Sequence, residues 1–353
     1  MVNSKSLRRK IALFIVLALT MTACGKNPEQ SEEPSKESTV VKSEEKSEEV
    51  ETQEQVEEAQ AMSESVMDVM CGASGIVARA DGSLLVTDIY NKVIWQVQVH
   101  NGISTVYAGG ETVADLYGEP VGGYNDDILE ESYFKEPWAI SPFLDGYAVS
   151  DAKNNVVRYV SKENVQTVNG STKEKIAISN LGVRFENPTG LATDEDGNLY
   201  ISDTLCGAIR KIDEKGNLVT VADELEEPMG LCWKNGVLYI AEAGLNRIVK
   251  LEAGKVTVVA GGEEAGFEDG EGTAALFDGP QGVAVSDDGV IYVADTGNSA
   301  VREIRDGVVS TLLSRDRTSS LEMCPISPVG MLVSGNDLYI CDSFARKVIR
   351  IGR

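Results

Sequence analysis

Short apolar segments separated by polar turns recur along the chain from about residue 63. In the clearest copy, apolar Val283 follows a Pro and a Gly, a turn covers residues 286–289, and a second apolar segment ends at Asp295. A third segment begins near Val301, and a Val/Thr-rich fourth segment follows it. Alternation of apolar and polar positions over such short runs predicts β-strands rather than helices.

The same order of features occurs six times. Each second strand closes with an acid, and an aliphatic residue follows six positions later. The acids are Asp88, Asp151, Asp203, Glu242, Asp295 and Asp342, and the aliphatics are Ile94, Val157, Ile209, Ile248, Val301 and Val348. Each first strand opens with a small residue, namely Gly75, Ala139, Gly190, Gly230, Gly282 or Gly330. Because one such unit cannot cover its own faces, the pattern predicts an all-β, six-bladed β-propeller of four-stranded blades over residues 63–353.

The last unit lacks a fourth strand. The chain ends just after Ile351, which belongs to the third strand of that unit. Residues 65–70, ahead of the first unit, are similar to fourth strands such as residues 105–109. We therefore expect the N-terminal strand to complete the sixth blade, which closes the ring and covers two sheet edges.

The repeat resembles the NHL repeat over roughly residues 65–353. The likeness rests on a Pro-x-Gly lead into the first strand, Asp-Gly turns such as Asp288-Gly289, Asp-x-x-Asn turns such as Asp295 to Asn298, and Ala-Gly-Gly at residues 108–110 and 260–262. The resemblance implies a propeller but not one activity, since propellers host many functions. NHL-like and related propellers include lyases and lactonases that use metals held by His or acidic ligands.

The first residues indicate an export signal. Lys5, Arg8, Arg9 and Lys10 precede an apolar run at residues 11–19, and small residues then lead to Cys24. This resembles a bacterial lipoprotein signal peptide, which implies removal of residues 1–23, lipidation of Cys24 and anchoring on the extracytoplasmic side of the cell membrane. An ordinary secretory signal with an incidental Cys is the alternative. Residues 24–62 contain no aromatic residue and are expected to be a disordered acidic tether.

Charge restricts the partners of the chain. The net charge is −24, and removal of the four basic residues before Cys24 brings it to −28. Such a chain repels nucleic acid and anionic lipid headgroups. The one histidine, His100, precedes an Asn-Gly pair and is expected in a solvated hairpin turn, which leaves little room for His-based metal or acid–base chemistry.

A candidate ligand site follows from the order of strands. Connectors between blades and turns after second strands share one face, the top face, while the other turns form the bottom face. Residues just before the small residue of each first strand are expected at the mouth of the central channel. These are Ser74, Trp138, Thr189, Met229, Gln281 and Val329. They could bind a ligand there, or they could simply plug the channel.

The acids that close the second strands suggest a metal cage at first sight. Asp before a polar turn more often accepts hydrogen bonds from turn N–H groups, so we expect a structural role. A Ca²⁺ site is the alternative in two aligned connectors, at Asp126, Asp127, Glu268, Asp269 and Glu271, although no known calcium-loop spacing occurs there.

Basic residues and cysteines yield two further expectations. Arg158, Arg210 and Arg302 share one position on third strands, where they could pair with carboxylates of neighbouring blades. Among the cysteines, Cys71 and Cys324 lie in connectors of adjoining blades and form the favoured disulfide, although sequence alone does not fix the pairing.

Together these features predict an extracytoplasmic binding or scaffold propeller. Its top face would recognise a protein, peptide or glycan, with no nucleic-acid partner and no required cofactor. The alternative is a metal-dependent hydrolase or lyase that uses acidic ligands at the central channel. A structural subunit of an envelope complex, docked through its acidic surface on a basic partner, is a third hypothesis.

Overall fold

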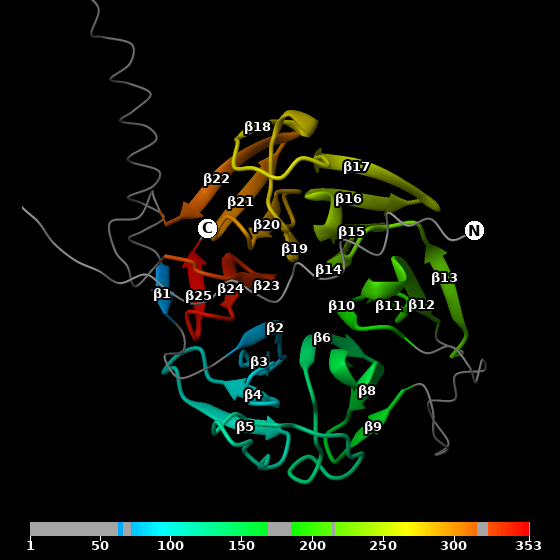
Figure 1. The fold of residues 1–353 in the computed structure, drawn as a ribbon, viewed down its shortest axis with the longest axis vertical. Helices are drawn as coiled ribbons and strands as arrows, with labels where there is room; N and C mark the ends of the chain where they lie inside the picture. The colour runs from blue at the N-terminus through cyan, green and yellow to red at the C-terminus, as the bar shows by residue number, and fades with distance from the viewer. Residues whose placement is uncertain (1–62, 66–71, 169–184, 214–215, 316–323, 353) are drawn as a thin grey trace, which may run out of the picture. The chain divides into compact units, whose positions relative to one another are not determined.

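Six antiparallel sheets surround a common axis in the computed structural model, which describes residues 63–65, 72–168, 185–213, 216–315 and 324–352. Figure 1 looks along this axis and shows the sheets as blades with their first strands innermost. Neighbouring first strands contact each other around the whole ring. The sequence-based prediction of an all-β, six-bladed propeller is therefore confirmed.

The first three blades each contain four strands in chain order. Blade 1 comprises β2 (Ala73–Ala78), β3 (Leu84–Asp88), β4 (Val93–Val97) and β5 (Ser104–Ala108). Blade 2 comprises β6 (Pro137–Phe143), β7 (Gly146–Asp151), β8 (Val156–Val160) and β9 (Val165–Thr167). Blade 3 comprises β10 (Pro188–Thr193), β11 (Leu199–Asp203), β12 (Ala208–Ile212) and β13 (Leu218–Ala222).

The other three blades depart from this scheme in two places. Blade 4 comprises β14 (Pro228–Lys234), β15 (Val237–Glu242), β16 (Arg247–Glu252) and β17 (Lys255–Gly261). Blade 5 comprises β19 (Gly282–Val285), β20 (Ile291–Asp295), β21 (Ala300–Arg305) and β22 (Val308–Ser314). It has a fifth strand, β18 (Gly270–Glu271), which pairs with β22 and which the sequence did not predict. Blade 6 comprises β23 (Pro328–Ser334), β24 (Asp337–Asp342), β25 (Lys347–Gly352) and β1 (Ser63–Ser65).

Short 3₁₀ turns follow the second strands of three blades. They are η1 (Ala152–Asn154), η2 (Thr204–Cys206) and η3 (Ala243–Leu245), and a fourth, η4 (Gly272–Ala274), lies in the connector before blade 5. None of the helical segments in the described ranges has the length and apolar character needed to cross a membrane.

The N-terminal strand closes the ring as the sequence predicted. Ser63 pairs with Ile351 and Ser65 pairs with Ile349, so β1 is the fourth strand of blade 6. This strand begins two residues before the expected start at residue 65, and residues 66–70 lie outside the described residues. Because β25 runs towards the bottom face, Ser63 lies at the bottom end of β1.

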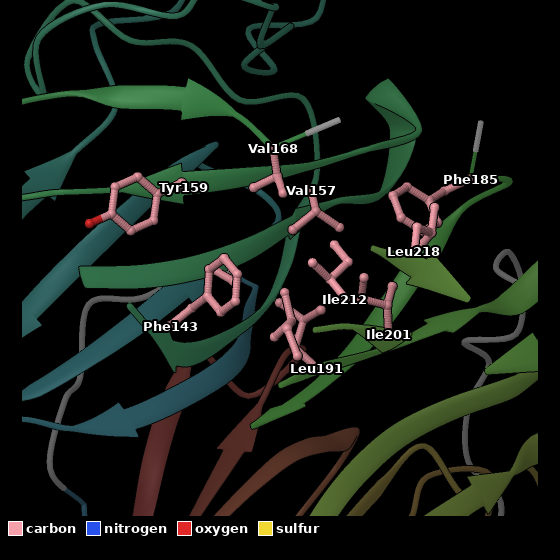
Figure 2. Close-up of a cluster of buried hydrophobic side chains, with 11 residues drawn as sticks. Phe143, Val157, Tyr159, Val168, Phe185, Leu191, Ile201, Ile212 and Leu218 are labelled. Carbon is pink, nitrogen blue, oxygen red and sulfur yellow. The ribbon is translucent and has the colours of Figure 1, made fainter. Parts of the chain in front are cut away.

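Hydrophobic clusters fill all six interfaces between adjacent blades. Figure 2 shows the cluster between blades 2 and 3, where Phe143 and Val157 meet Leu191 and Ile201. On β11, Ile201 faces blade 2 and the next-door Tyr200 faces blade 4. Successive side chains of a strand point to opposite faces, and here both faces are buried, which explains the nearly continuous apolar runs of the second strands.

Candidate functional site

The central channel contains a cavity of about 70 Å³. Aliphatic side chains of the first strands line it, including Ile76, Leu191 and Val283, which are almost fully buried. Ligand pockets usually enclose about 300–1,000 Å³, whereas 70 Å³ holds about two water molecules. At about 70 Å³ this cavity is smaller than the pockets that usually hold drug-sized ligands.

The six predicted mouth residues lie on the inner strands or at their start, but only some of them reach the channel. Ser74, Trp138, Gln281 and Val329 border the cavity, whereas Thr189 and Met229 do not. Three of the six are buried, namely Ser74, Thr189 and Val329. Trp138, Met229 and Gln281 are half-buried and offer the accessible part of the mouth. Ligand binding by this set stays a prediction.

Hydroxyl groups beside the mouth connect neighbouring blades. Ser74 Oγ donates to the carbonyl oxygen of Pro137 at 3.2 Å, and Thr87 Oγ1 donates to that of Trp138 at 2.9 Å. Thr189 Oγ1 lies 2.7 Å from Thr204 Oγ1. These side chains are hydrogen-bonded inside the protein: the Ser74 bond joins blades 1 and 2, whereas the Thr189 contact lies within blade 3.

Glycines at the start of the first strands bring adjacent blades into close contact. A Cβ added to Gly282 would lie 1.8 Å from the carbonyl oxygen of Val329, and one added to Gly330 would lie 2.1 Å from that of Ser74. The register of most inner strand pairs shifts at this point, as between Pro188 and Leu191. Such a bulge turns the backbone towards its neighbour. The repeated glycine is therefore required by blade packing rather than by a ligand.

The six acids that end the second strands are fully buried. Asp342 accepts backbone N–H bonds from Ile326, Ser327 and Ala345, so its carboxylate joins the connector before blade 6 to the turn after β24. Asp151 accepts from two connector N–H groups, each at 2.9 Å. The expected structural role is confirmed, but the donors differ in part from those predicted. Asp88 and Asp342 accept N–H bonds from the turn that follows, whereas Asp151, Asp203, Glu242 and Asp295 accept them from the preceding connector. Burial raises the pKa of Asp88 and of Asp295, against the opposing effect of their hydrogen-bond donors.

Arg158 and Arg302 are clamped inside the two long connectors, and both side chains are 0% exposed. Arg302 donates to Asp295 at 2.8 Å, to Asp269 at 2.6 Å and to two connector carbonyl oxygens. Its guanidinium also lies over Phe267 and Phe277, 4.8 and 5.2 Å from the ring centres.

Arg158 makes the same contacts in blade 2. It donates to Asp151 at 3.2 Å and to Asp126 at 2.6 Å, and it lies over Tyr124 and Phe134. The expectation that these arginines pair with carboxylates of neighbouring blades was wrong, because Arg158, Arg210 and Arg302 each pair with the acid of their own blade.

Two of the five candidate Ca²⁺ ligands are therefore already paired with buried arginines. Asp126 and Asp269 are the carboxylates that receive the buried arginines, and a calcium ion would have to displace a guanidinium from each. Across the described ranges, no group of three or more His, Cys, Asp or Glu side chains is arranged to hold a metal ion. His100 is exposed in the turn between β4 and β5, as predicted.

Four cysteines of the described residues carry free thiols. Cys324 is one of them and is buried, while Cys71, its partner in the favoured disulfide, lies outside the described residues, so that pairing stays a prediction. Cys232 and Cys341 are also free, and burial raises the pKa of both thiols, that of Cys232 to about 11. Buried thiols with raised pKa values are poor nucleophiles.

Exposed apolar side chains gather in the connectors and in the turns after second strands. Eleven of the seventeen large hydrophobic side chains exposed in the described residues lie there, namely Tyr90, Val113, Leu116, Tyr117, Val121, Tyr124, Ile128, Leu205, Phe267, Ile326 and Phe344. The repeat pattern does not distinguish these residues. A usable signal was present, because Val113, Leu116 and Tyr117 are apolar residues in a segment that has no counterpart in the aligned connector.

The NHL repeat model matches residues 277–304, which run from the end of a long connector to β21 of blade 5. The chain is a six-bladed β-propeller with an NHL repeat. It is 30% identical over 166 residues to Protein SUPPRESSOR OF QUENCHING 1, chloroplastic, of Arabidopsis thaliana, which corresponds to 39% of this chain and 15% of that protein. The aligned part of this chain therefore spans only a small share of the length of this relative.

Solved structures share the propeller fold with different activities. An auxiliary nutrient binding protein from Bacteroides thetaiotaomicron has a TM-score of 0.61 and 14% identity, over 80% of this chain and 69% of the other. Virginiamycin B lyase from Staphylococcus aureus has a TM-score of 0.52 and 11% identity, over 80% and 95%. At these identities the likeness shows the fold alone, so the NHL-repeat propeller has both binding proteins and enzymes among its structural neighbours.

Proposed function

We propose that the chain is a lipid-anchored binding propeller that recognises a protein, peptide or glycan outside the cytoplasmic membrane through its top face. Exposed apolar side chains in the connectors and top-face turns carry this proposal, apart from Ile128, which lies beside Asn164 of a bottom-face turn. Apolar patches of this kind mark interaction sites on soluble proteins. Because these side chains are mostly aliphatic and aromatic, a protein or peptide suits them better than a glycan.

The alternative of a hydrolase or lyase finds little support in the channel. That hypothesis required three or more free carboxylates at the mouth, whereas the six acids are directed into their own loops. A catalytically inactive form of the Staphylococcus aureus lyase has alanine in place of a histidine. In this chain His100 is the one histidine, and it lies in a bottom-face turn away from the channel.

Lipidation at Cys24 is the second element of the proposal. The chain enters the propeller at Ser63, at the bottom end of β1, so a tether from the membrane would join the bottom face. The top face would then remain accessible to a partner.

Replacement of Cys24 by serine is expected to remove the lipid anchor. In cells fed a labelled fatty acid, the full-length protein should carry label and sediment with membranes, whereas Cys24→Ser should carry none. Cys206→Ser, at an exposed cysteine of the propeller, is the matched control and should keep the label. Equal labelling of Cys24→Ser and the unchanged protein would refute lipidation at this residue.

Cross-linking on intact cells tests the binding function. The tagged full-length protein is expected to capture one dominant exported protein, identified by mass spectrometry. Simultaneous Trp138→Ala and Gln281→Ala should lower its recovery about tenfold, since half-buried residues at the centre of a binding face often dominate affinity. Leu144→Ala, at an exposed bottom-face turn, should leave recovery unchanged. Recovery of no exported protein above background would overturn the proposed function.

A further inference from the structure

The two long connectors are built alike except for one insertion. Both begin with Gly-Gly after a fourth strand, and both carry the aromatic residues and the Asp that enclose a buried arginine. Twelve residues separate Gly110 from Gly123, whereas three separate Gly262 from Gly266. The connector before blade 5 encloses Arg302 without the additional residues. The insertion in the connector before blade 2 is thus not needed for this clamp.

Residues 111–121, which contain the insertion and are here named the finger, form a small hairpin. Ala114 and Pro120 form an antiparallel bridge, and the N–H of Val121 donates to the carbonyl oxygen of Val113 at 3.0 Å. The Asp115 carboxylate accepts N–H bonds from Tyr117 at 2.7 Å and from Glu119 at 3.0 Å. A turn closed by Asx bonds of this kind is formed before any partner binds, which reduces the entropy lost on binding.

Apolar side chains occupy the end of the finger. Leu116 is 100% exposed, Tyr117 is 90% exposed and Val113 is 80% exposed. Other large hydrophobic residues of the described chain reach at most 65%, at Leu205. Exposure this complete means that these side chains contribute nothing to the core of the propeller.

The charge around the finger indicates the kind of surface it fits. Residues 109–134 contain seven acids and no Lys, Arg or His, and the acids are Glu111, Asp115, Glu119, Asp126, Asp127, Glu130 and Glu131. An anionic membrane surface would repel this segment. A protein pocket that is apolar at its centre and basic at its rim would accept both the side chains at the tip and the surrounding carboxylates.

We propose that the finger inserts Leu116 and Tyr117 into an apolar pocket, rimmed by Lys or Arg, on an extracytoplasmic protein. This rests on the proposed binding function and assigns its main contact. A preformed pair of exposed apolar side chains, flanked in the sequence by acids, matches the anatomy of an interface, in which a buried apolar centre lies inside a polar rim. Charge complementarity at the rim makes the binding weaker at high salt.

A photo-cross-linking amino acid placed at residue 116 of the full-length protein tests this proposal on intact cells. The same amino acid at residue 103, an exposed bottom-face position, is the matched control. We expect residue 116 to cross-link one exported protein that residue 103 does not. Cross-linking to lipid, or to a second copy of this chain, would overturn the proposal.

The cross-linked protein is then purified and its affinity for the purified full-length chain is measured. Leu116→Ala with Tyr117→Ala should weaken binding at least tenfold at unchanged melting temperature, and added salt should weaken binding of the unchanged chain. Ile103→Ala should have no effect. If whole-chain cross-linking finds a partner whose affinity the finger variant does not change, the finger proposal fails and the binding function stands. If no exported partner is found by either route, both fail.

Discussion

Replacement of Gly282 by alanine is expected to lower the free energy of unfolding by at least about 3 kcal/mol, at the upper end of penalties for overpacking. The new Cβ would lie 1.8 Å from the carbonyl oxygen of Val329 on the next blade. Gly282 pairs with Ala294 in its own sheet, and Val329 lies at the bulge of β23 between the paired Pro328 and Met331, so the two blades must separate to accept the methyl group. Urea denaturation followed by circular dichroism measures the loss.

Gly262→Ala is the matched control for this experiment. Gly262 lies in the connector before blade 5, and a Cβ there meets no atom within 4 Å. Its replacement should change the midpoint of unfolding little. Equal stability of the two variants would show that the inner ring can expand, and that the glycine repeat has another cause.

Replacement of Arg302 by methionine is expected to cost about 3–5 kcal/mol, the penalty for breaking a buried ion pair by removal of one partner. The change leaves the Asp295 carboxylate buried without its arginine and removes the guanidinium donors from Asp269 and from the connector carbonyl oxygens. The connector before blade 5 should therefore also become sensitive to limited proteolysis. Chemical denaturation and mapping of the first cleavage sites give the two readouts.

Arg305→Ala, three residues further along β21, is the matched control. It also removes a positive charge, but it leaves the contacts of Arg302 with Asp295, Asp269 and the connector intact. Arg305 lies 3.7 Å from Asp288 with both side chains more than half exposed. Exposed pairs contribute about 0–1 kcal/mol, so this variant should stay close to the unchanged protein and keep its connector resistant to proteolysis. A similar loss in both variants would contradict the clamp.

Features that repeat could be predicted from the sequence. The number of blades, the closing strand and the structural role of the six acids all follow from one spacing that occurs six times. The carboxylates that pair with the arginines could not be inferred in the same way, because they depend on which residues of the second and third strands lie opposite each other. Asp295 pairs with Ala300, and side chains on a strand alternate, so Arg302 lies on the same face as the acid of its own blade.

The close approach of neighbouring first strands at these glycines could not be predicted from the sequence either. The glycines were recognised, but their function depends on the distance between two first strands, which no single blade defines. The finger was missed for a different reason. Residues 111–121 have no counterpart in the connector before blade 5, so the spacing that repeats six times says nothing about them.

Ring closure by β1 places the first and last strands of the propeller in one sheet. A chain that emerges from its N-terminus delivers β1 early and β25 after the other strands, so the sixth blade can form only once β25 has been made. Pairing between distant segments is slow because a long loop must close first. Until then the apolar face of blade 1 that packs on blade 6, including Ala73 and Ile76, stays in water. The net charge of −24 then has a use during biogenesis, since it keeps such open chains apart until they close.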